Sequence, residues 1–256
     1  MSFRDNARFY TINGMQYPSV TTILGVIDKS APLMHWAVNQ ERKAFEAALL
    51  DVLSHDGARD PSYVLDRMAT AISGQKAMLK EKDKAASIGT AAHALIEWHT
   101  RRMLGEDPGP EPKVPDAAAW AVEAWKDWAK AVDFTPLCAE RVVYCEECGY
   151  AGTLDWIARV DGVLSLGDYK TAKAIYPEAF LQNRAYRHAA VKVGLSETVQ
   201  GIVLRLPKTV DDPAFEAMVV PETPLEDFLS ALRLWRWQRR MDGKSTGRGR
   251  SAAVAS

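Results

Sequence analysis

The sequence contains no long apolar run. None of its apolar stretches approaches the roughly 18 residues that a membrane-spanning helix requires. The segment MSFRDNARFY at the N-terminus lacks the apolar region of a secretory signal peptide. With 47% hydrophobic and 25% charged residues, the composition is typical of a globular protein that buries a full core. We therefore expect a cytoplasmic protein that has no membrane partner.

Cysteine is also scarce. The three cysteines are Cys138, Cys145 and Cys148, and so small and odd a number argues against a framework of disulfides. The segment CEEC has the spacing of two metal ligands, but no second pair of Cys or His residues lies close to it in sequence. We interpret the segment as the end of a strand with two unrelated thiols; a structural zinc or cluster site is the alternative.

Neither sign of charge is in excess. The 32 Lys and Arg residues and the 33 Asp and Glu residues give a formal net charge of -1. Bulk charge therefore does not point to a polyanionic partner, although binding to one needs only a local basic surface. The segment 233–250, RLWRWQRRMDGKSTGRGR, contains seven Arg or Lys residues and one Asp. It is either such a surface or the solvated end of a helix followed by a disordered tail.

Turn residues and hydrophobic periodicity divide the chain into helices and strands. Asn13-Gly14 predicts a hairpin, because this dipeptide is the strongest local signal for a two-residue turn. Apolar residues at helical or alternating spacing predict the remaining elements. We predict helices at 33–53, 61–72, 84–104, 116–132, 177–194 and 223–241, and strands at 135–146, 149–160, 162–171, 198–208 and 214–221, the last at an edge.

The order of these elements predicts an α/β fold. From Lys84 to Lys208 the chain runs through a helix, three strands, a helix and a strand. A helix that connects two strands of one sheet implies a mixed central sheet with helices on its faces. We expect an N-terminal hairpin and helical region at 1–84, a core with a C-terminal helix at 85–242, and a disordered tail at 243–256.

Two carboxylates interrupt a predicted hairpin that is otherwise mainly apolar. Asp155 and Asp168 lie on its two strands, each six positions from the Asp161-Gly162 turn. A symmetric hairpin places them nearly opposite each other, where they repel unless a cation such as Mg²⁺ lies between them. Lys170 shares a strand face with Asp168. The pattern favours a metal site; an Asp168–Lys170 pair at a sheet edge is the alternative, but it leaves Asp155 unexplained.

Two helices contribute further candidates. His93 and Glu97 are four residues apart in GTAAHALIE and so share a helix face, from which both can reach a metal held by a neighbouring sheet. A core histidine beside a surface glutamate is the simpler alternative. Gln182 and Tyr186 have the same spacing in QNRAY, where the simpler alternative is the decoration of an amphipathic helix.

The segments GTAAHALIE, GTLD, GDYKTAK and QNRAY, in this order, resemble the motifs of the PD-(D/E)XK nucleases. Within that superfamily the sequence is similar to the RecB-type and phage exonuclease branch, which includes the nuclease of CRISPR adaptation and the mitochondrial genome maintenance exonuclease. The resemblance covers roughly Ala85 to Lys208, about half of the chain. It implies a restriction-endonuclease-like core with a mixed central sheet flanked by helices.

The resemblance also implies roles for individual residues and a cofactor. One or two Mg²⁺ or Mn²⁺ ions are implied, whereas the iron-sulfur cluster of the CRISPR-associated relatives, which uses four cysteines, is not expected in a chain that has three. The implied catalytic residues are Asp155, Asp168 and Lys170. The implied metal ligands are His93, Asp155, Asp168 and the backbone carbonyl of Tyr169. Glu97 and Glu140 are possible helpers, and the implied DNA-binding residues are Gln182 and Tyr186.

By the same resemblance, we expect a DNA exonuclease that works from DNA ends in phage-type recombination, replication or repair and leaves 5′-phosphates. Its expected partners are DNA with a free end or single-stranded DNA, and a single-strand annealing protein; a phage-encoded protein would act in the host cytoplasm. A structure-specific or sequence-specific endonuclease, a non-catalytic DNA-binding module and a hydrolase of small phosphate esters are the alternatives.

Overall fold

The computed structural model of the protein describes residues 7–28, 30–54, 60–72, 77–195, 197–208, 212 and 214–248. Contacts divide the chain into two units, one formed by Met1–Ile27 with Ala91–Ser256 and the other by Asp28–Thr90. The N-terminal hairpin, β1 (Phe9–Ile12) and β2 (Met15–Pro18), therefore belongs with the sheet rather than with the helices that follow it, which differs from the division expected from the sequence.

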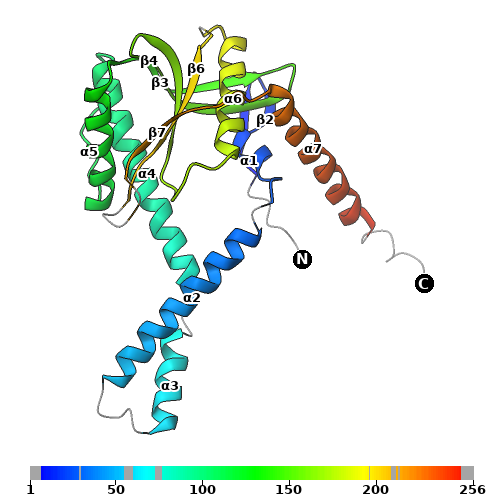
Figure 1. Ribbon diagram of the computed structural model, residues 1–256. Coiled ribbons are helices and arrows are strands. Elements are labelled where there is room, and N and C mark those ends of the chain that lie inside the picture. Colours follow the sequence, from blue (N-terminus) through cyan, green and yellow to red (C-terminus); the bar gives the residue numbers. More distant parts are fainter. Residues whose placement is uncertain are drawn as a thin grey trace, which may run out of the picture. The chain divides into compact units, whose positions relative to one another are not determined.

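The larger unit is built around a mixed sheet of five strands in the order β3-β4-β5-β6-β7 (Figure 1). Only β5 and β6 are parallel; the other neighbours are antiparallel. The predicted α/β class with a mixed sheet and flanking helices is confirmed. The strands are β3 (Phe134–Cys145), β4 (Tyr150–Val160), β5 (Val163–Lys170), β6 (Gln200–Arg205) and β7 (Glu216–Val219).

Helices cover both faces of this sheet (Figure 1). On one face, α6 (Glu178–Lys192), α1 (Val20–Leu24) and α7 (Leu225–Arg248) enclose a core that includes Tyr150, Leu154 and Phe228. On the other face, Trp125 of α5 (Asp116–Ala131) packs against Phe134 and the sheet, beside the part of α4 (Ala77–Met103) that starts at Ala91.

Most predicted elements are found, with three differences at helices, one of which is that α4 begins at Ala77 instead of Lys84. The short helix α1 was not predicted; Ser19 begins it, because its hydroxyl accepts a hydrogen bond from the Thr22 N–H at 3.0 Å. Helix α7 continues to Arg248, beyond the boundary expected at 243, and residues 249–256 of the expected tail lie outside the described residues.

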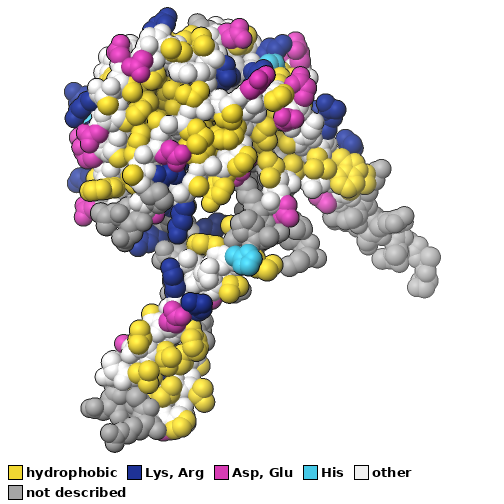
Figure 2. Space-filling model, in the orientation of Figure 1, with side chains coloured by type: hydrophobic (Ala, Val, Ile, Leu, Met, Phe, Trp, Pro, Cys, Tyr) yellow, Lys and Arg dark blue, Asp and Glu magenta, His cyan; other side chains and the backbone are white. Residues whose placement is uncertain are grey.

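The smaller unit contains α2 (Ser30–Leu53), α3 (Pro61–Ile72) and α4 up to Thr90. Asp60 caps α3 by accepting a hydrogen bond from the Ser62 N–H at 2.9 Å, as its position before the helix predicts. Val52 and Met68 are buried, whereas apolar side chains remain exposed along both helices (Figure 2). These exposed side chains include Leu33, Met34, Val38, Phe45, Leu50, Leu53 and Leu65.

None of the helices in the described part of the chain combines the length and the apolar character that a membrane span requires.

Candidate metal and catalytic centre

The strands β4 and β5 separate at the two predicted carboxylates. Their ladder runs from Val160–Val163, beside the turn, to Trp156–Gly167 and stops there. The same register, continued by one step, would bring Asp155 opposite Asp168, but the ladder has ended before that step. On its other edge β5 stays paired with β6 as far as Lys170. Asp155 and Asp168 therefore lie at the point where the sheet opens between β4 and β5.

Asp168 is almost completely buried and has two unlike carboxylate oxygens. Its side chain is 2% exposed. Oδ1 accepts a hydrogen bond from Gln182 Nε2 at 2.8 Å. Oδ2 forms an ion pair with the Lys170 ammonium but accepts no aligned hydrogen bond from any described residue. The Lys170 ammonium therefore compensates the charge of this buried oxygen in the metal-free protein.

Gln182 orients both charged groups of this pair. Its Oε1 accepts a hydrogen bond from Lys170 Nζ at 3.1 Å, and its Nε2 donates to Asp168 Oδ1 and, at 3.2 Å, to Tyr186 Oη. The side chains of Gln182 and Tyr186 are only 9% and 4% exposed. The predicted shared face of α6 is confirmed, and it turns inward to the site rather than outward to solvent.

The glycine of the GTLD segment makes room for this arrangement. A Cβ atom at Gly152 would lie 2.3 Å from the Tyr186 ring, closer than van der Waals contact allows. Glycine at this position of β4 therefore lets the Tyr186 ring pack directly on the strand, two residues before Leu154 and three before Asp155.

Asp155 is held from the opposite strand. Its Oδ2 accepts a hydrogen bond from the backbone N–H of Tyr169 at 2.6 Å, which is possible because the β4–β5 ladder has ended. Burial, followed by the negative charge of Asp168, raises the pKa of Asp155 to about 6, although His93, Lys170 and the hydrogen bond from Tyr169 act in the opposite direction. The carboxylate thus carries a charge that the protein alone does not fully compensate.

Glu140 is a second carboxylate with a raised pKa. Burial, followed by the negative charges of Asp155 and Glu97, raises its pKa to about 7, while Arg101 and Arg8 lower it. Its backbone has a φ of 47° in the middle of β3, a left-handed conformation that non-glycine residues rarely adopt. Such strain, of roughly 1–3 kcal/mol, persists where the surrounding structure enforces it and is frequent at functional sites.

The predicted His93–Glu97 pair has divided roles. The His93 ring lies edge-on to the ring of Tyr169, with 5.5 Å between the ring centroids, and its charge acts on Asp155. Glu97 Oε1 instead pairs with Arg101 Nε at 2.8 Å. His93 therefore lies close enough to Asp155 for an electrostatic interaction, whereas the Glu97 carboxylate pairs with Arg101.

The backbone carbonyl of Tyr169 faces the opening. In a parallel ladder the backbone groups of alternate residues point to the same edge of a strand. Val199 N donates to the Leu164 carbonyl and Leu206 N to the Lys170 carbonyl, so even-numbered residues of β5 face β6. The Tyr169 carbonyl consequently points to the β4 side, where the ladder has ended.

The chemistry of these donors fits a hard divalent cation. Two aspartates, a glutamate with a raised pKa and a strand carbonyl are oxygen ligands of the type that Mg²⁺ and Mn²⁺ prefer. The side chains are not drawn closely together, however. Among the described residues, the set of three Cys, His, Asp or Glu side chains whose ligand atoms lie within 4.8 Å of one another is Cys145, Cys148 and His188, at another place.

Two residues at the start of the N-terminal hairpin, Arg8 and Tyr10, join this region although no sequence pattern predicts it. Tyr10 Oη lies 2.9 Å from Thr153 Oγ1 on β4. The Arg8 guanidinium stacks over the Tyr10 ring at 5.0 Å and lowers the pKa of Glu140. Both residues precede Asp155 by more than a hundred positions, so only the folded chain brings the Tyr10 hydroxyl group to β4 and the Arg8 charge close to Glu140.

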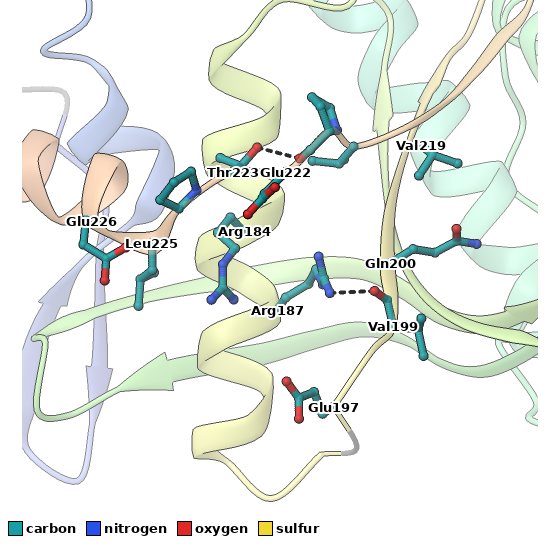
Figure 3. A pocket seen from close by; sticks show the side chains of 13 residues that line it. Arg184, Arg187, Glu197, Val199, Gln200, Val219, Glu222, Thr223, Leu225 and Glu226 are labelled. Carbon is teal, nitrogen blue, oxygen red and sulfur yellow. Dashed lines mark hydrogen bonds between the residues drawn. The ribbon is translucent and has the colours of Figure 1, made fainter.

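A cavity of about 540 Å³ lies apart from these carboxylates, between α6, the start of β6 and the segment after β7 (Figure 3). Its lining includes Arg184, Arg187 and Glu222. Arg187 donates hydrogen bonds to the Thr198 carbonyl at 2.7 Å and the Val199 carbonyl at 3.0 Å, so this guanidinium ties α6 to the strand instead of offering its charge to a ligand. The cavity is therefore a less suitable candidate for a catalytic site than the region where β4 and β5 separate.

Comparisons with known proteins do not identify a family. No protein-family model matches the chain, and no curated protein sequence is significantly similar to it.

Proposed function

We propose that the protein is a metal-dependent deoxyribonuclease with a PD-(D/E)XK core, and that it hydrolyses DNA from its ends. The observation that carries the proposal is the position of Asp155 and Asp168 directly after the last β4–β5 pair, one on each strand, with Lys170 beside Asp168. This combination supplies two cation ligands and one ammonium within a single opening. The order of motifs in the sequence supports the same conclusion.

The residues that would hold Mg²⁺ or Mn²⁺ are Asp155, Asp168 and the Tyr169 carbonyl, with His93 as a further ligand. Glu140 interacts electrostatically with Asp155 and is a possible helper. When bound, such a cation supplies Lewis-acid activation of water and of the phosphoryl oxygens. Asp155 remains fixed for this role by the Tyr169 N–H, and Asp168 by the amide of Gln182.

Lys170 would act on the water and on the phosphate rather than on the metal. Its ammonium group, placed by Asp168 and by Gln182 Oε1, can orient the attacking water and stabilise the charge that develops on the phosphoryl oxygens. Water adds to phosphorus, the bond to the 3′ oxygen breaks, and a 5′-phosphate and a 3′-hydroxyl group result. Gln182 and Tyr186 are positioning residues in this scheme, because their polar groups contact Lys170, Asp168 and each other.

Basic side chains on two elements offer phosphate contacts. Arg8 extends from the N-terminal hairpin and is exposed. Helix α7 carries the exposed residues Arg233 and Arg240, and an exposed Trp237 whose ring can stack on an unpaired base. Electrostatic binding of this kind tolerates a near-neutral overall charge because it depends on the local surface.

The proposal is tested by incubating linear duplex, closed circular duplex and single-stranded DNA with the protein in Mg²⁺, Mn²⁺ or EDTA. We expect cleavage of linear or single-stranded DNA only with a divalent cation, and its loss in Lys170→Ala. Lys130→Ala, an exposed lysine on α5, is the matched control and should cleave as the wild type does.

Each other outcome selects a different function. Cleavage of closed circles in place of ends indicates an endonuclease, and metal-independent DNA binding without cleavage indicates a binding module. Hydrolysis of a small phosphate ester without cleavage of DNA indicates a phosphoesterase. Equal cleavage by wild type and Lys170→Ala would contradict the proposed site itself.

A further inference from the structure

The thiols of the CEEC segment have a third partner that is remote in sequence. Cys145 ends β3, Cys148 lies in the turn before β4, and His188 belongs to α6. Their ligand atoms all lie within 4.8 Å of one another. No second pair of Cys or His residues lies close to CEEC in sequence; the fold instead supplies a single histidine from about forty residues further along the chain.

The turn itself has the backbone arrangement of a metal-binding loop. The Cys148 N–H donates a hydrogen bond to Cys145 Sγ at 3.3 Å, which stabilises negative charge on that sulfur. The Gly149 N–H donates to the Cys145 carbonyl at 2.8 Å, and Gly149 has a φ of 71°, which lets the chain reverse directly after the second cysteine. Both sulfurs thereby point from one turn toward α6.

The His188 ring is oriented by a hydrogen-bond partner, as in metal-binding sites. The Tyr150 hydroxyl donates its hydrogen to the Ala185 carbonyl at 3.1 Å and lies 2.8 Å from His188 Nδ1. With the hydroxyl hydrogen directed at that carbonyl, Nδ1–H can donate to Tyr150 Oη, and this is the tautomer that leaves the lone pair of His188 on Nε2. A buried partner that fixes the tautomer in this way is the usual companion of a metal-ligating histidine.

We propose that Cys145, Cys148 and His188 form a zinc site that fastens the β3–β4 turn to α6. Two thiolates and an imidazole are ligands that select Zn²⁺, and no fourth His, Cys, Asp or Glu among the described residues joins the set, which leaves the fourth position to water. Ligand atoms of a tetrahedral Zn²⁺ lie about 3.6–3.8 Å apart. Small side-chain rotations, which move each ligand atom by less than the length of a bond, would bring the three atoms to this spacing.

The surroundings of the site give the ion a path of entry and add further contacts across the same junction. Cys145 is completely buried, whereas Cys148 and His188 are half-buried and border on solvent, which gives the ion a path of entry. Across the same junction Lys192 Nζ pairs with Glu147 Oε2 at 2.8 Å, and Arg236 of α7 donates to the Cys148 carbonyl at 2.6 Å. The site does not depend on the proposed nuclease activity, and its ligands are soft where those at Asp155 and Asp168 are hard.

The test is the zinc content of the full-length protein, purified under reducing conditions and dialysed without chelator. We expect one zinc ion per chain in the wild type and in the matched control Cys138→Ser, and little zinc in Cys148→Ser and His188→Asn. Substitution by Co²⁺ should give the visible absorption of tetrahedral thiolate coordination in the wild type and not in Cys148→Ser.

A second measurement serves if a ligand variant does not fold. Alkylation of the three wild-type cysteines is followed by mass spectrometry after metal removal, with and without added Zn²⁺. Protection of Cys145 and Cys148, but not of Cys138, supports the site. Zinc-free wild-type protein that alkylates equally fast in added Zn²⁺, or Cys148→Ser with full zinc content, would overturn it, and iron in place of zinc would overturn the choice of metal.

Discussion

Replacement of Asp155 by asparagine is expected to stabilise the metal-free protein at neutral pH. The pKa of this carboxyl group is raised from 3.8 to about 6, first by burial and then by the negative charge of Asp168. The ionised form is therefore less favourable in the folded than in the unfolded chain. An amide has nearly the same shape and keeps an oxygen acceptor for the Tyr169 N–H, but it carries no charge to be compensated.

The magnitude follows from the raised pKa. A tenfold change in the acid constant corresponds to about 1.4 kcal/mol, so the difference sets an upper limit of about 3 kcal/mol. Because Asp155 is only half-buried, solvent screening lowers the expected gain to about 1–3 kcal/mol. In a folding unit of this size, such a gain raises Tm by about 2–10 °C.

The gain should depend on pH in one direction. Below about pH 4 the wild-type carboxyl group is protonated in both the folded and the unfolded state, so the wild type and Asp155→Asn should have similar Tm values. As the pH rises through about 6, the wild type loses the favourable contribution of the protonated form. The advantage of the variant should therefore be complete above that pH.

Thermal melts in EDTA across this pH range, repeated with saturating Mn²⁺, provide the assay. Mn²⁺ that binds the native state stabilises it by mass action, by about 2.7 kcal/mol at a hundredfold excess over Kd. It should therefore raise the Tm of the wild type but not that of Asp155→Asn, and so remove the advantage of the variant. Asp127→Asn, in an exposed pair with Lys130, is the control and should change little. A lower Tm for Asp155→Asn at neutral pH in EDTA, or an equal rise with Mn²⁺ in both proteins, would refute the reasoning.

Three further substitutions have definite expected outcomes. Asp168→Ala should abolish cleavage while DNA binding, measured by fluorescence anisotropy, survives; retained cleavage would exclude Asp168 from the chemistry. His93→Ala should weaken Mn²⁺ binding and activity by about 10–100-fold with partial recovery at high Mn²⁺, whereas a lower Tm without recovery would indicate a core histidine. Gly167→Ala should destabilise the fold by about 1–3 kcal/mol or more, because its Cβ would lie 1.8 Å from the Trp156 ring; an unchanged denaturation midpoint would show that this contact yields easily.

Local patterns in the sequence were sufficient to predict the hairpin that carries the carboxylates. The dipeptide Asp161-Gly162 has positive φ values of 50° and 78°, the conformation of a two-residue hairpin turn. Such a turn fixes the register of both strands, and the register fixes which residues stand opposite each other. For that reason the matching positions of Asp155 and Asp168 on the two strands could be derived from counting, and the shared face of Gln182 and Tyr186 from the helical period.

The partners of those residues were decided by the tertiary structure alone. The contact of Tyr10 with β4, the strained backbone of Glu140 and the pairing of Glu97 with Arg101 leave no periodic signal in the sequence. Likewise, His188 meets Cys145 and Cys148 only because α6 packs across the β3–β4 turn. Periodicity and turn chemistry act between neighbours in the chain, whereas burial and charge act between neighbours in space, which the packing of helices on the sheet creates.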